Sequence, residues 1–456
     1  MNIMYSPKAY GGHNWARRNP RLLGVLVFIF CISLLAVFDT DHRQTVTRHV
    51  FKYVGAQQPV VFAIIMYGLG SAEEGHVFLK SAMMHTSVPL EFHIITDTAG
   101  QGYIEERMRL VSRPLHDIKV VFYPLSKKAM EHRLDRTGEP NANGEVMGIL
   151  RTDHWGGYAG MMKLFLHEIL PTTVKRAIFV DTDAIIVSDP ALMWRQFDKF
   201  TRDTAAAIPM HDSAERPVMS QKWRGGSRIC SCVLMLDLER MREEIFMTST
   251  LFPARMRRRS IGPPAIKAWW GEAQGGHPPG KYYEHVGLGV SRTPPRPDDM
   301  HNWTDTNQQD QGYWYALKEY SPHIFQPLHL GWEVTTCIWN QYNVGLHGSD
   351  NMTVAEHIAS QANLEKTPDE GKLLIPYLLH FNCMGDHDPY FHPENWKDPT
   401  KGHVKAFMPT VMHYVHYKYV WLNQGDGIAS MSMETQQDLR YWDERVAGHE
   451  VADGYD

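Results

Sequence analysis

IFVDTDAIIVSDP, at residues 178–190, is an apolar run interrupted by two aspartates one residue apart. An apolar run of this kind is typical of a buried strand, and two carboxylates at its end are costly to bury unless something pairs them. Residues i and i+2 of a strand share a face, so we expect Asp181 and Asp183 to converge on one point. Hard divalent cations prefer carboxylate oxygens, and open α/β sheets bind ligands at the carboxyl ends of their strands. The stretch therefore predicts a metal site that holds a phosphorylated substrate.

The alternative for this Asp-x-Asp motif is a solvated turn without function, because so short a pattern occurs by chance in many proteins. The apolar runs on both sides of the motif, at residues 177–180 and 184–187, favour the metal site.

The composition is that of a globular protein and excludes few function classes. The 456 residues are enough for one large domain or for two or three ordinary ones. Hydrophobic content is 43% and charged content is 21%. The net charge of -5 gives no reason to expect nucleic-acid binding. We interpret the local basic run RMRRR, at residues 255–259, as a solvated loop rather than a site for a polyanion.

An uncharged apolar segment at residues 22–38 predicts a membrane anchor. It is at the short limit for a membrane helix, which needs about 20 residues, and a short span suits the thinner membranes early in the secretory route. Basic residues precede it and no acidic residue occurs before Asp39, which predicts a cytosolic N-terminus and a luminal body. A cleaved signal peptide is the alternative, but the residues at 36–38 form a poor cleavage site. The chain is therefore predicted to be a single-pass type II protein of the Golgi or the endoplasmic reticulum.

The cysteines and two glycosylation acceptors, Asn302 and Asn351, fit a luminal body. Five cysteines are too few for a disulfide scaffold, and Cys31 lies in the predicted anchor. Four remain, and the sequence does not rank their three full pairings: Cys230, Cys232, Cys337 and Cys383. If Cys230 and Cys232 lie on one strand, we expect them not to bond each other.

Strands and helices alternate along the first half of the chain, which predicts a mainly parallel α/β sheet. The expected strands are residues 60–66, 90–96 and 119–123, and the expected helices are residues 72–86 and 161–170. Further expected elements are a strand and helix at 231–241, ordered segments at 310–320 and 373–380, and a helix at 403–422. The predicted organisation is a cytosolic tail at 1–21, the anchor at 22–38, a stem at 39–58, one domain at 59–425 with a long irregular insertion at 253–308, and a C-terminal tail at 426–456.

Six stretches resemble glycosyltransferase family 8, in the order of that family, and most closely the xylosyltransferase domain of LARGE-type enzymes and the glucoside xylosyltransferases. The most specific is GGYAGMMKLFLHEILPTTVKRAIFVDTDAIIVSDPALMWRQF at 156–197. The others are PLEFHIITD at 89–97, VLMLDLERMR at 233–242, QDQGYWYAL at 309–317, LLHFN at 378–382 and KGHVKAFMPTVMHY at 401–414.

This resemblance implies a GT-A nucleotide-sugar transferase fold, in which a Rossmann-like, mainly parallel sheet is flanked by helices and preceded here by one N-terminal transmembrane helix. It implies a retaining, metal-dependent transfer of a hexosyl or pentosyl unit from a UDP-sugar to a glycan or glycoprotein acceptor. The metal ligands implied are Asp181, Asp183 and His380. Carboxylates with an imidazole suit Mn²⁺, with Mg²⁺ as the alternative. The remaining coordination positions would take the diphosphate oxygens of the donor.

The resemblance also implies which residues surround the donor. Those expected to bind the nucleotide are Ile65, Met66, Tyr67, Lys163 and Thr182, together with the two aspartates. The alternative for Lys163 is an ordinary surface lysine. Asp310 and Gln311 match an Asp-Gln pair that faces the donor sugar, so Asp310 is expected to orient a sugar or acceptor hydroxyl and Gln311 to lie near the anomeric carbon.

The implied mechanism uses one face of the sugar, with the leaving diphosphate helping to deprotonate the acceptor. A retaining hydrolase would instead use two carboxylates, one of them as nucleophile, and the chain offers no clear nucleophile beyond Asp310. The protein would then act by positioning and by neutralising charge on the leaving group, which is metal catalysis of the Lewis-acid kind.

Two departures from the family pattern leave the transferred sugar open. Relatives carry Asn-x-Gly before the strand that here begins at Val233, where this chain has Cys-Ser-Cys at residues 230–232. Relatives also carry a glycine and a lysine after the histidine ligand, whereas Gly385 has no lysine nearby. The sequence does not indicate an oligomeric state.

Two other functions remain open from the sequence. One is a catalytically silent Golgi protein that keeps the GT-A fold. The other is a phosphatase of the haloacid dehalogenase type, which also ends a strand in Asp-x-Asp but carries Thr or Val where this chain has Ile185.

Overall fold

The computed structural model describes residues 58–135, 137, 157–210, 229–244, 261–262, 265, 310–336, 353, 375–382, 389–392 and 402–436. The predicted tail, anchor and stem up to residue 57 lie outside these residues, as does most of the insertion at 253–308. So do Asn302, Asn351, Cys31, Cys337 and Cys383. Within the described part of the chain, no helix combines the length and the apolar character that crossing a membrane requires.

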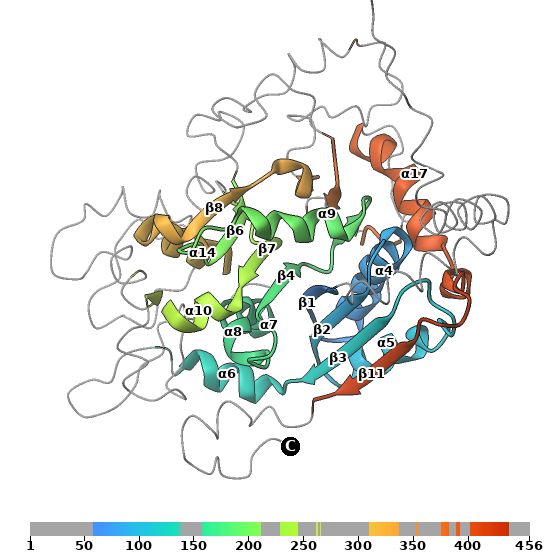
Figure 1. Cartoon of the computed structure of the whole chain (residues 1–456), viewed down its shortest axis with the longest axis horizontal. Helices are drawn as coiled ribbons and strands as arrows, with labels where there is room; N and C mark the ends of the chain where they lie inside the picture. Colours follow the sequence, from blue (N-terminus) through green and yellow to red (C-terminus); the bar gives the residue numbers. More distant parts are fainter. Residues whose placement is uncertain are drawn as a thin grey trace, which may run out of the picture. The chain divides into compact units, whose positions relative to one another are not determined.

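An eight-stranded sheet forms the centre of the fold (Figure 1). Its strands, in spatial order, are β11 (Met431–Thr435), β3 (Ile118–Pro124), β2 (Leu90–Thr96), β1 (Val60–Met66), β4 (Arg176–Val180), β7 (Val233–Asp237), β6 (Ala206–Pro209) and β8 (Phe325–Leu328). β1 pairs in parallel with β2 and β4, while β7 is antiparallel to both of its neighbours. The prediction of a mainly parallel α/β sheet is therefore confirmed.

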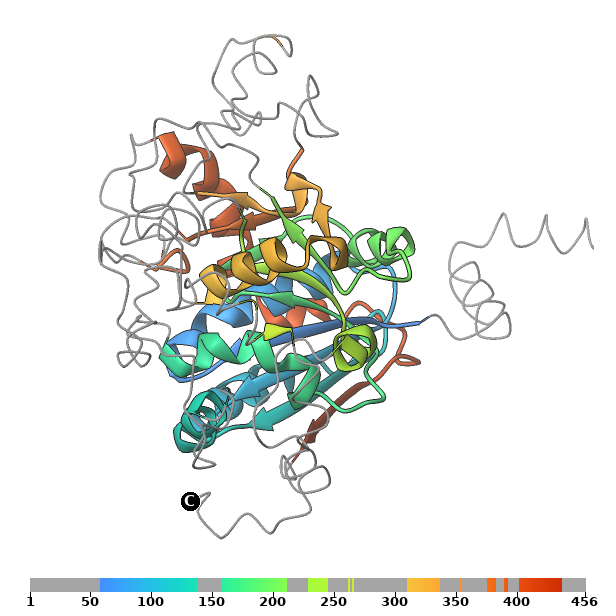
Figure 2. The same cartoon turned by 90° about the vertical axis from the view of Figure 1, so that its left-hand side faces the viewer.

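Helices pack on both faces of this sheet and give a three-layer arrangement (Figures 1 and 2). Side chains alternate along a strand, so in β1 Ala63 and Ile65 enter one core while Phe62 and Ile64 enter the other. The first core also contains residues of α6 (Lys127–Asp135), α7 (Gly157–Met161), α8 (Leu166–Ile169), α10 (Leu238–Glu244) and α14 (Asp310–Tyr320). The second contains residues of α4 (Leu69–His85), α5 (Thr98–Met108), α9 (Pro190–Trp194), η2 (Arg195–Lys199) and η9 (Tyr419–Leu422).

Two predicted helices are interrupted in the structure. The expected helix at 161–170 consists of the end of α7, the 3-10 turn η1 (Met162–Phe165) and α8. Every residue of this segment is buried, so contacts on all sides, and not one amphipathic face, decide its local geometry. The segment expected as one helix at 403–422 is α17 (Gly402–His416) followed by the 3-10 turn η9. At the end of α17, Lys80 Nζ donates to the main-chain carbonyls of Val415 and Tyr417 at 2.9 Å each. A cation that binds the last carbonyls is a common way to end a helix.

The sheet continues past residue 425, where the sequence analysis places the end of the domain. β11 pairs in parallel with β3 from Met431 to Thr435 and forms an edge of the sheet (Figure 1). Edge strands are paired on one side only and are half exposed, so MSMET carries little of the apolar signal that identifies a central strand.

A second, three-stranded sheet carries part of the candidate site. Its strands are β5 (Ala184–Ile186), β10 (Leu378–His380) and β9 (Val334–Thr335), with β10 in the middle. β10 is antiparallel to β5 and parallel to β9. A third apolar cluster, which includes Leu379, Phe381 and Phe407 of α17, packs around this sheet. The small sheet therefore joins the segment after the Asp-x-Asp motif at residues 181–183, called the D-x-D motif below, to chain segments that are distant in sequence.

Candidate functional site

The two aspartates of the motif lie in a turn between the two sheets. β4 ends at Val180 and β5 begins at Ala184, so the expectation that both aspartates share a face of one strand is wrong. Hydrogen bonds hold both ends of the turn: Asp181 N donates to Cys232 O at 2.8 Å, and Phe381 N donates to Asp183 O at 2.8 Å. The turn is thus attached to β7 on one side and to β10 on the other.

His380 meets the motif because of the register of the small sheet. In the antiparallel pairing of β10 with β5, His380 lies opposite Ala184, the residue after Asp183. His380 Nε2 is 3.3 Å from Asp183 Oδ1. One ligand atom from each of Asp181, Asp183 and His380 falls within 4.8 Å of the others. The structure therefore brings the three predicted metal ligands together.

The charges of this pair support each other. Burial disfavours the imidazolium, but Asp183 and Cys230 together outweigh burial, and the pKa of His380 is raised well above its usual value. Burial likewise disfavours the Asp183 carboxylate, but His380 and Lys163 together outweigh burial, and the pKa of Asp183 is lowered. In the absence of a cation, the imidazolium therefore occupies the place of positive charge beside this carboxylate.

Lys163 lies in the site and not on the surface. Its Nζ is 2.8 Å from Asp181 Oδ1 and 3.4 Å from Asp310 Oδ1, and 7% of its side chain is exposed. Burial works against the ammonium, but the Asp181 and Asp310 carboxylates outweigh it and raise the pKa of Lys163. The residue lies in η1, so the interrupted helix places this cation between the D-x-D turn and α14.

Asp310, at the first position of α14, is almost completely buried. Burial raises the pKa of this carboxyl, while Lys163 and a hydrogen bond with Ser231 oppose the rise. Gln311 follows in the same helical turn and is half-buried. The Asp-Gln pair predicted to face the sugar thus begins a helix whose first carboxylate reaches the lysine of the site.

The edge predicted to receive the nucleobase lies beside the D-x-D turn. β1 and β4 are parallel neighbours. Residues 65–67 and the motif therefore both follow the carboxyl ends of central strands and lie on the same side of the sheet. Ile65 and Met66 are buried, and Tyr67 is half-buried. Gly75 of α4 allows a close approach here, because a Cβ atom at this position would be 2.6 Å from Met66 Cε and 3.0 Å from Thr182 Cγ2.

Glu74 is a further carboxylate of the site that sequence reasoning missed. Thr182 Oγ1 donates a short hydrogen bond to Glu74 Oε2. Burial, followed by repulsion from Asp183, raises the pKa of Glu74 to about 8. Burial also raises the pKa of Asp181 to about 7, with Lys163 opposing and Asp183 adding to the rise. Glu74 is one of several polar residues in an amphipathic helix, so no local signal distinguishes it.

Two further groups reach His380 from the side opposite Asp183. His380 Nδ1 is 3.2 Å from Glu333 Oε1 and 3.8 Å from Cys230 Sγ. The sequence identified Cys230 only as a departure from the family pattern, and Glu333 carried no signal because it stands alone between apolar residues.

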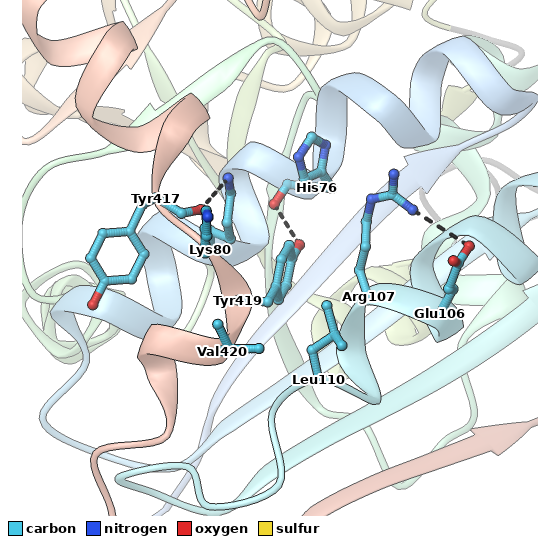
Figure 3. Close-up of a pocket in the computed structure, with 9 residues that line it drawn as sticks. His76, Lys80, Glu106, Arg107, Leu110, Tyr417, Tyr419 and Val420 are labelled. Atoms are coloured by element: carbon cyan, nitrogen blue, oxygen red, sulfur yellow. Dashed lines mark hydrogen bonds and ion pairs between the residues drawn. The ribbon is translucent and has the colours of Figure 1, made fainter.

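A pocket of about 390 Å³ lies elsewhere, between α4, α5 and residues 417–420 (Figure 3). Lys80 and Tyr419 line it, but Lys80 binds main-chain carbonyls and the Tyr419 hydroxyl donates to His76 O at 2.9 Å (Figure 3). None of the predicted site residues lines this pocket. It is therefore separate from the candidate site.

The side chains of Asp181, Asp183 and His380 form a set of ligands that could bind one divalent cation. Two carboxylates and an imidazole suit a divalent cation such as Mn²⁺ or Mg²⁺. The carboxylates of Glu74, Asp181, Asp183 and Asp310 outnumber the cations Lys163 and His380. An additional positive charge would relieve their repulsion.

Comparison with known proteins relates part of the chain to glycosyltransferases. No protein-family model matches it. Human xylosyl- and glucuronyltransferase LARGE1 is 30% identical over 151 residues, which make up 32% of this chain and 18% of that protein. Mouse xylosyl- and glucuronyltransferase LARGE2 is 29% identical over 139 residues, which make up 30% of this chain and 18% of that protein. The chain thus spans less than a fifth of the length of these curated relatives.

Among solved structures, mouse xyloside xylosyltransferase 1 gives a TM-score of 0.44 at 16% identity, covering 72% of this chain and 100% of that one. The galactosyltransferase LgtC in complex with donor and acceptor sugar analogues gives a TM-score of 0.40 at 11% identity, covering 78% of this chain and 96% of that one. TM-scores this low indicate only a loose likeness of the backbones. The sequence comparison confirms the expected resemblance: over about a third of its length, the chain is similar to LARGE-type glycosyltransferases.

Proposed function

We propose that this chain is a metal-dependent, retaining glycosyltransferase that moves a hexosyl or pentosyl unit from a UDP-sugar to a glycan or glycoprotein acceptor. The main support is the cluster of Asp181, Asp183 and His380, whose ligand atoms lie within 4.8 Å of one another. The similarity to LARGE-type glycosyltransferases over part of the chain is independent support.

In this proposal Asp181, Asp183 and His380 hold Mn²⁺, with Mg²⁺ as the alternative. The cation would neutralise charge on the leaving diphosphate. Asp183 also faces His380 Nε2, so it orients the imidazole before the cation binds. The register between β10 and β5 holds this histidine in place without help from the substrate.

Lys163 and Asp310 form the second part of the proposed site. Lys163 bridges Asp181 and Asp310, so it links the metal ligands to the start of α14. In the proposal Asp310 orients a hydroxyl of the sugar or of the acceptor, and Gln311 lies near the anomeric carbon. Thr182 and the end of β1, namely Ile65, Met66 and Tyr67, contact the nucleotide.

We also propose the domain organisation and location that the sequence suggests. Residues 22–38 would anchor the chain in the Golgi membrane as a type II protein, behind a cytosolic tail at 1–21. A stem at 39–58 and the domain that begins at residue 59 would lie in the lumen. This domain extends past the predicted boundary at 425, because β11 is part of its sheet, and the rest of the C-terminal segment follows it. This location would give the site access to UDP-sugars and to glycoproteins of the secretory pathway.

UDP release tests the proposal. The full chain is incubated with Mn²⁺ and separately with UDP-xylose, UDP-glucose, UDP-galactose and UDP-N-acetylglucosamine. We expect slow, metal-dependent release from one donor without an acceptor, and loss of release in Asp183→Ala. A folded chain that neither releases UDP from any donor nor binds UDP with metal would contradict the proposal and favour a silent protein. Phosphate release from phosphomonoesters would favour a phosphatase.

A further inference from the structure

A second cluster of metal-ligating side chains lies on the far side of the His380 ring from the D-x-D turn. It consists of Cys230, Cys232, Glu333 and His380, and one ligand atom from each falls within 4.8 Å of the others. Their exposed fractions are 5%, 2%, 0% and 3%. Burial of the Glu333 carboxylate is costly unless positive charge compensates it, and the imidazole beside it also faces Asp183.

Three separate chain segments build this cluster, and main-chain pairing fixes all three. The Cys-Ser-Cys segment precedes β7, and Cys232 O accepts the hydrogen bond from Asp181 N. Glu333 comes just before β9, which pairs in parallel with β10, where His380 is the last residue. Thr336 N donates to His380 O at 2.9 Å and closes this pairing. The ligand atoms are thus held together by two sheets, not by a flexible loop.

The distances are close to those of a tetrahedral zinc site. Zn–S bonds of about 2.3 Å and Zn–N or Zn–O bonds of about 2.0–2.1 Å place neighbouring ligand atoms about 3.3–3.8 Å apart. His380 Nδ1 is 3.8 Å from Cys230 Sγ and 3.2 Å from Glu333 Oε1. The Cys230 and Cys232 sulfurs are 2.7 Å apart, so this pair must open by about 1 Å for both sulfurs to bind one zinc ion.

We propose that Cys230, Cys232, Glu333 and the Nδ1 atom of His380 bind a Zn²⁺ ion next to the D-x-D site. Binding would release the two thiol protons and the Nδ1 proton of His380 to solvent, and would leave two thiolates, a carboxylate and an imidazole nitrogen around the cation. Thiolates select zinc, whereas the carboxylates of Asp181 and Asp183 suit Mn²⁺ or Mg²⁺. The two neighbouring sites would therefore bind different metals. With a cation in each, His380 would also release its Nε2 proton and bridge the two cations as an imidazolate.

The zinc ion would have a structural consequence for the neighbouring site. With Nδ1 bound to zinc, the ring plane of His380 is fixed and Nε2 faces Asp183, 3.3 Å away. The Cys-Ser-Cys segment would be fixed at the same time, and with it Ser231, which hydrogen-bonds Asp310. The proposal does not depend on glycosyl transfer, because it concerns only which cation these side chains bind.

Metal content tests the proposal directly. The full chain is purified without chelators and its metals are measured by plasma mass spectrometry. We expect about one zinc per chain that remains after dialysis, and near-complete loss in the double variant Cys230→Ser/Cys232→Ser. The matched control Cys337→Ser/Cys383→Ser should retain zinc, as should Asp181→Asn, which alters only the D-x-D site. Glu333→Gln should retain zinc more weakly than the parent chain.

Cobalt substitution gives a readout specific for thiolate ligands. Zinc is removed with a chelator and replaced by Co²⁺ in the parent chain, with circular dichroism to verify the fold. We expect a thiolate-to-cobalt charge-transfer band that is absent in Cys230→Ser/Cys232→Ser and present in Cys337→Ser/Cys383→Ser. A cation held only by the D-x-D ligands gives no such band.

Three results would overturn the proposal: a folded parent chain without bound zinc, a parent chain without the cobalt band, or a Cys230–Cys232 disulfide found by peptide mass spectrometry. Each can be obtained on the parent chain, so the test survives a variant that does not fold. UDP release is not part of the readout. Failure of the zinc proposal is therefore distinguishable from failure of the proposed transferase activity.

Discussion

Lys163 Nζ lies 2.8 Å from Asp181 Oδ1, and this contact joins the interrupted helix before β4 to the D-x-D turn after it. The lysine is buried and also reaches Asp310, 3.4 Å away. It is a permanent positive charge between two carboxylates that would otherwise repel each other. Lys163 lies in η1, the 3-10 turn that interrupts this helical segment.

Replacing Lys163 with methionine should strongly destabilise the protein. Removing one partner of a buried ion pair typically costs about 3–5 kcal/mol, because the other charge stays buried and uncompensated. We expect a loss of about this size in the free energy of unfolding, measured by urea denaturation in the presence of a chelator. Lys175→Met is the matched control, because Lys175 pairs with Glu239 on an exposed surface and should unfold like the parent. Equal stability of the two variants would contradict the role given to Lys163.

Asp183→Asn should abolish metal-dependent UDP release. The substitution removes a predicted metal ligand and the carboxylate that faces His380. Loss of a residue that merely supports a metal ligand costs about 10–100-fold, so loss of a ligand should lower the rate at saturating Mn²⁺ at least about 100-fold. Asp198→Asn, at an exposed position of η2, should release UDP at the parental rate. If Asp183→Asn released UDP at the parental rate, the proposed role of Asp183 as a metal ligand in the reaction would be contradicted.

The stability of the metal-free protein should fall as pH rises from about 4 to about 8. Folding raises the pKa of Asp181 from 3.8 to about 7 and that of Glu74 from 4.5 to about 8. A group with a raised pKa stabilises the folded state below its unfolded pKa, and this contribution is lost as pH rises through the folded pKa. Melting temperatures across this range, with a chelator present, measure the effect.

Mn²⁺ should reverse this loss, because the cation replaces protons on the carboxylates. We therefore expect a larger metal-induced rise in melting temperature at about pH 8 than at about pH 6. Glu74→Gln keeps an acceptor for Thr182 Oγ1 but cannot ionise, so it should flatten the alkaline part of the metal-free profile. If the melting temperature of the metal-free protein rose between about pH 6 and about pH 8, the expected repulsion between these carboxylates would be contradicted.

Arg242→Met should destabilise the fold without touching the candidate ligands. The guanidinium donates to four main-chain carbonyls that precede β4: His167, Leu170, Pro171 and Val174, at 2.8–3.2 Å. Buried carbonyls without a donor cost about 1–3 kcal/mol each, and relaxation should recover part of this. We expect a loss of about 2–4 kcal/mol in the free energy of unfolding. Arg195→Met, at an exposed position, should cost far less; if both variants unfold alike, the carbonyls have other donors.

Apolar patterns predicted the elements that are buried on both faces or amphipathic over many residues. The strands at 60–66 and 90–96 have the expected boundaries, and the segment at 310–320, expected only to be ordered, is the helix α14. The apolar pattern is less informative for a helical segment that is buried on all sides and for an edge strand that is mostly exposed. The fully buried segment at 161–170 contains a 3-10 turn, and the edge strand β11 was missed.

The sequence by itself determined the alternating α/β order and the D-x-D motif, because these depend on local composition, whereas the three expected metal ligands came from the resemblance to a known family. Only the tertiary structure decided that Asp181 and Asp183 lie in a turn, that Lys163 is buried against them, and that Glu74, Glu333 and the cysteines at 230 and 232 join the site. The physical reason is sheet register. The pairing of β10 with β5 and β9 brings side chains that are distant in sequence to opposite sides of one imidazole, and no local pattern encodes that pairing.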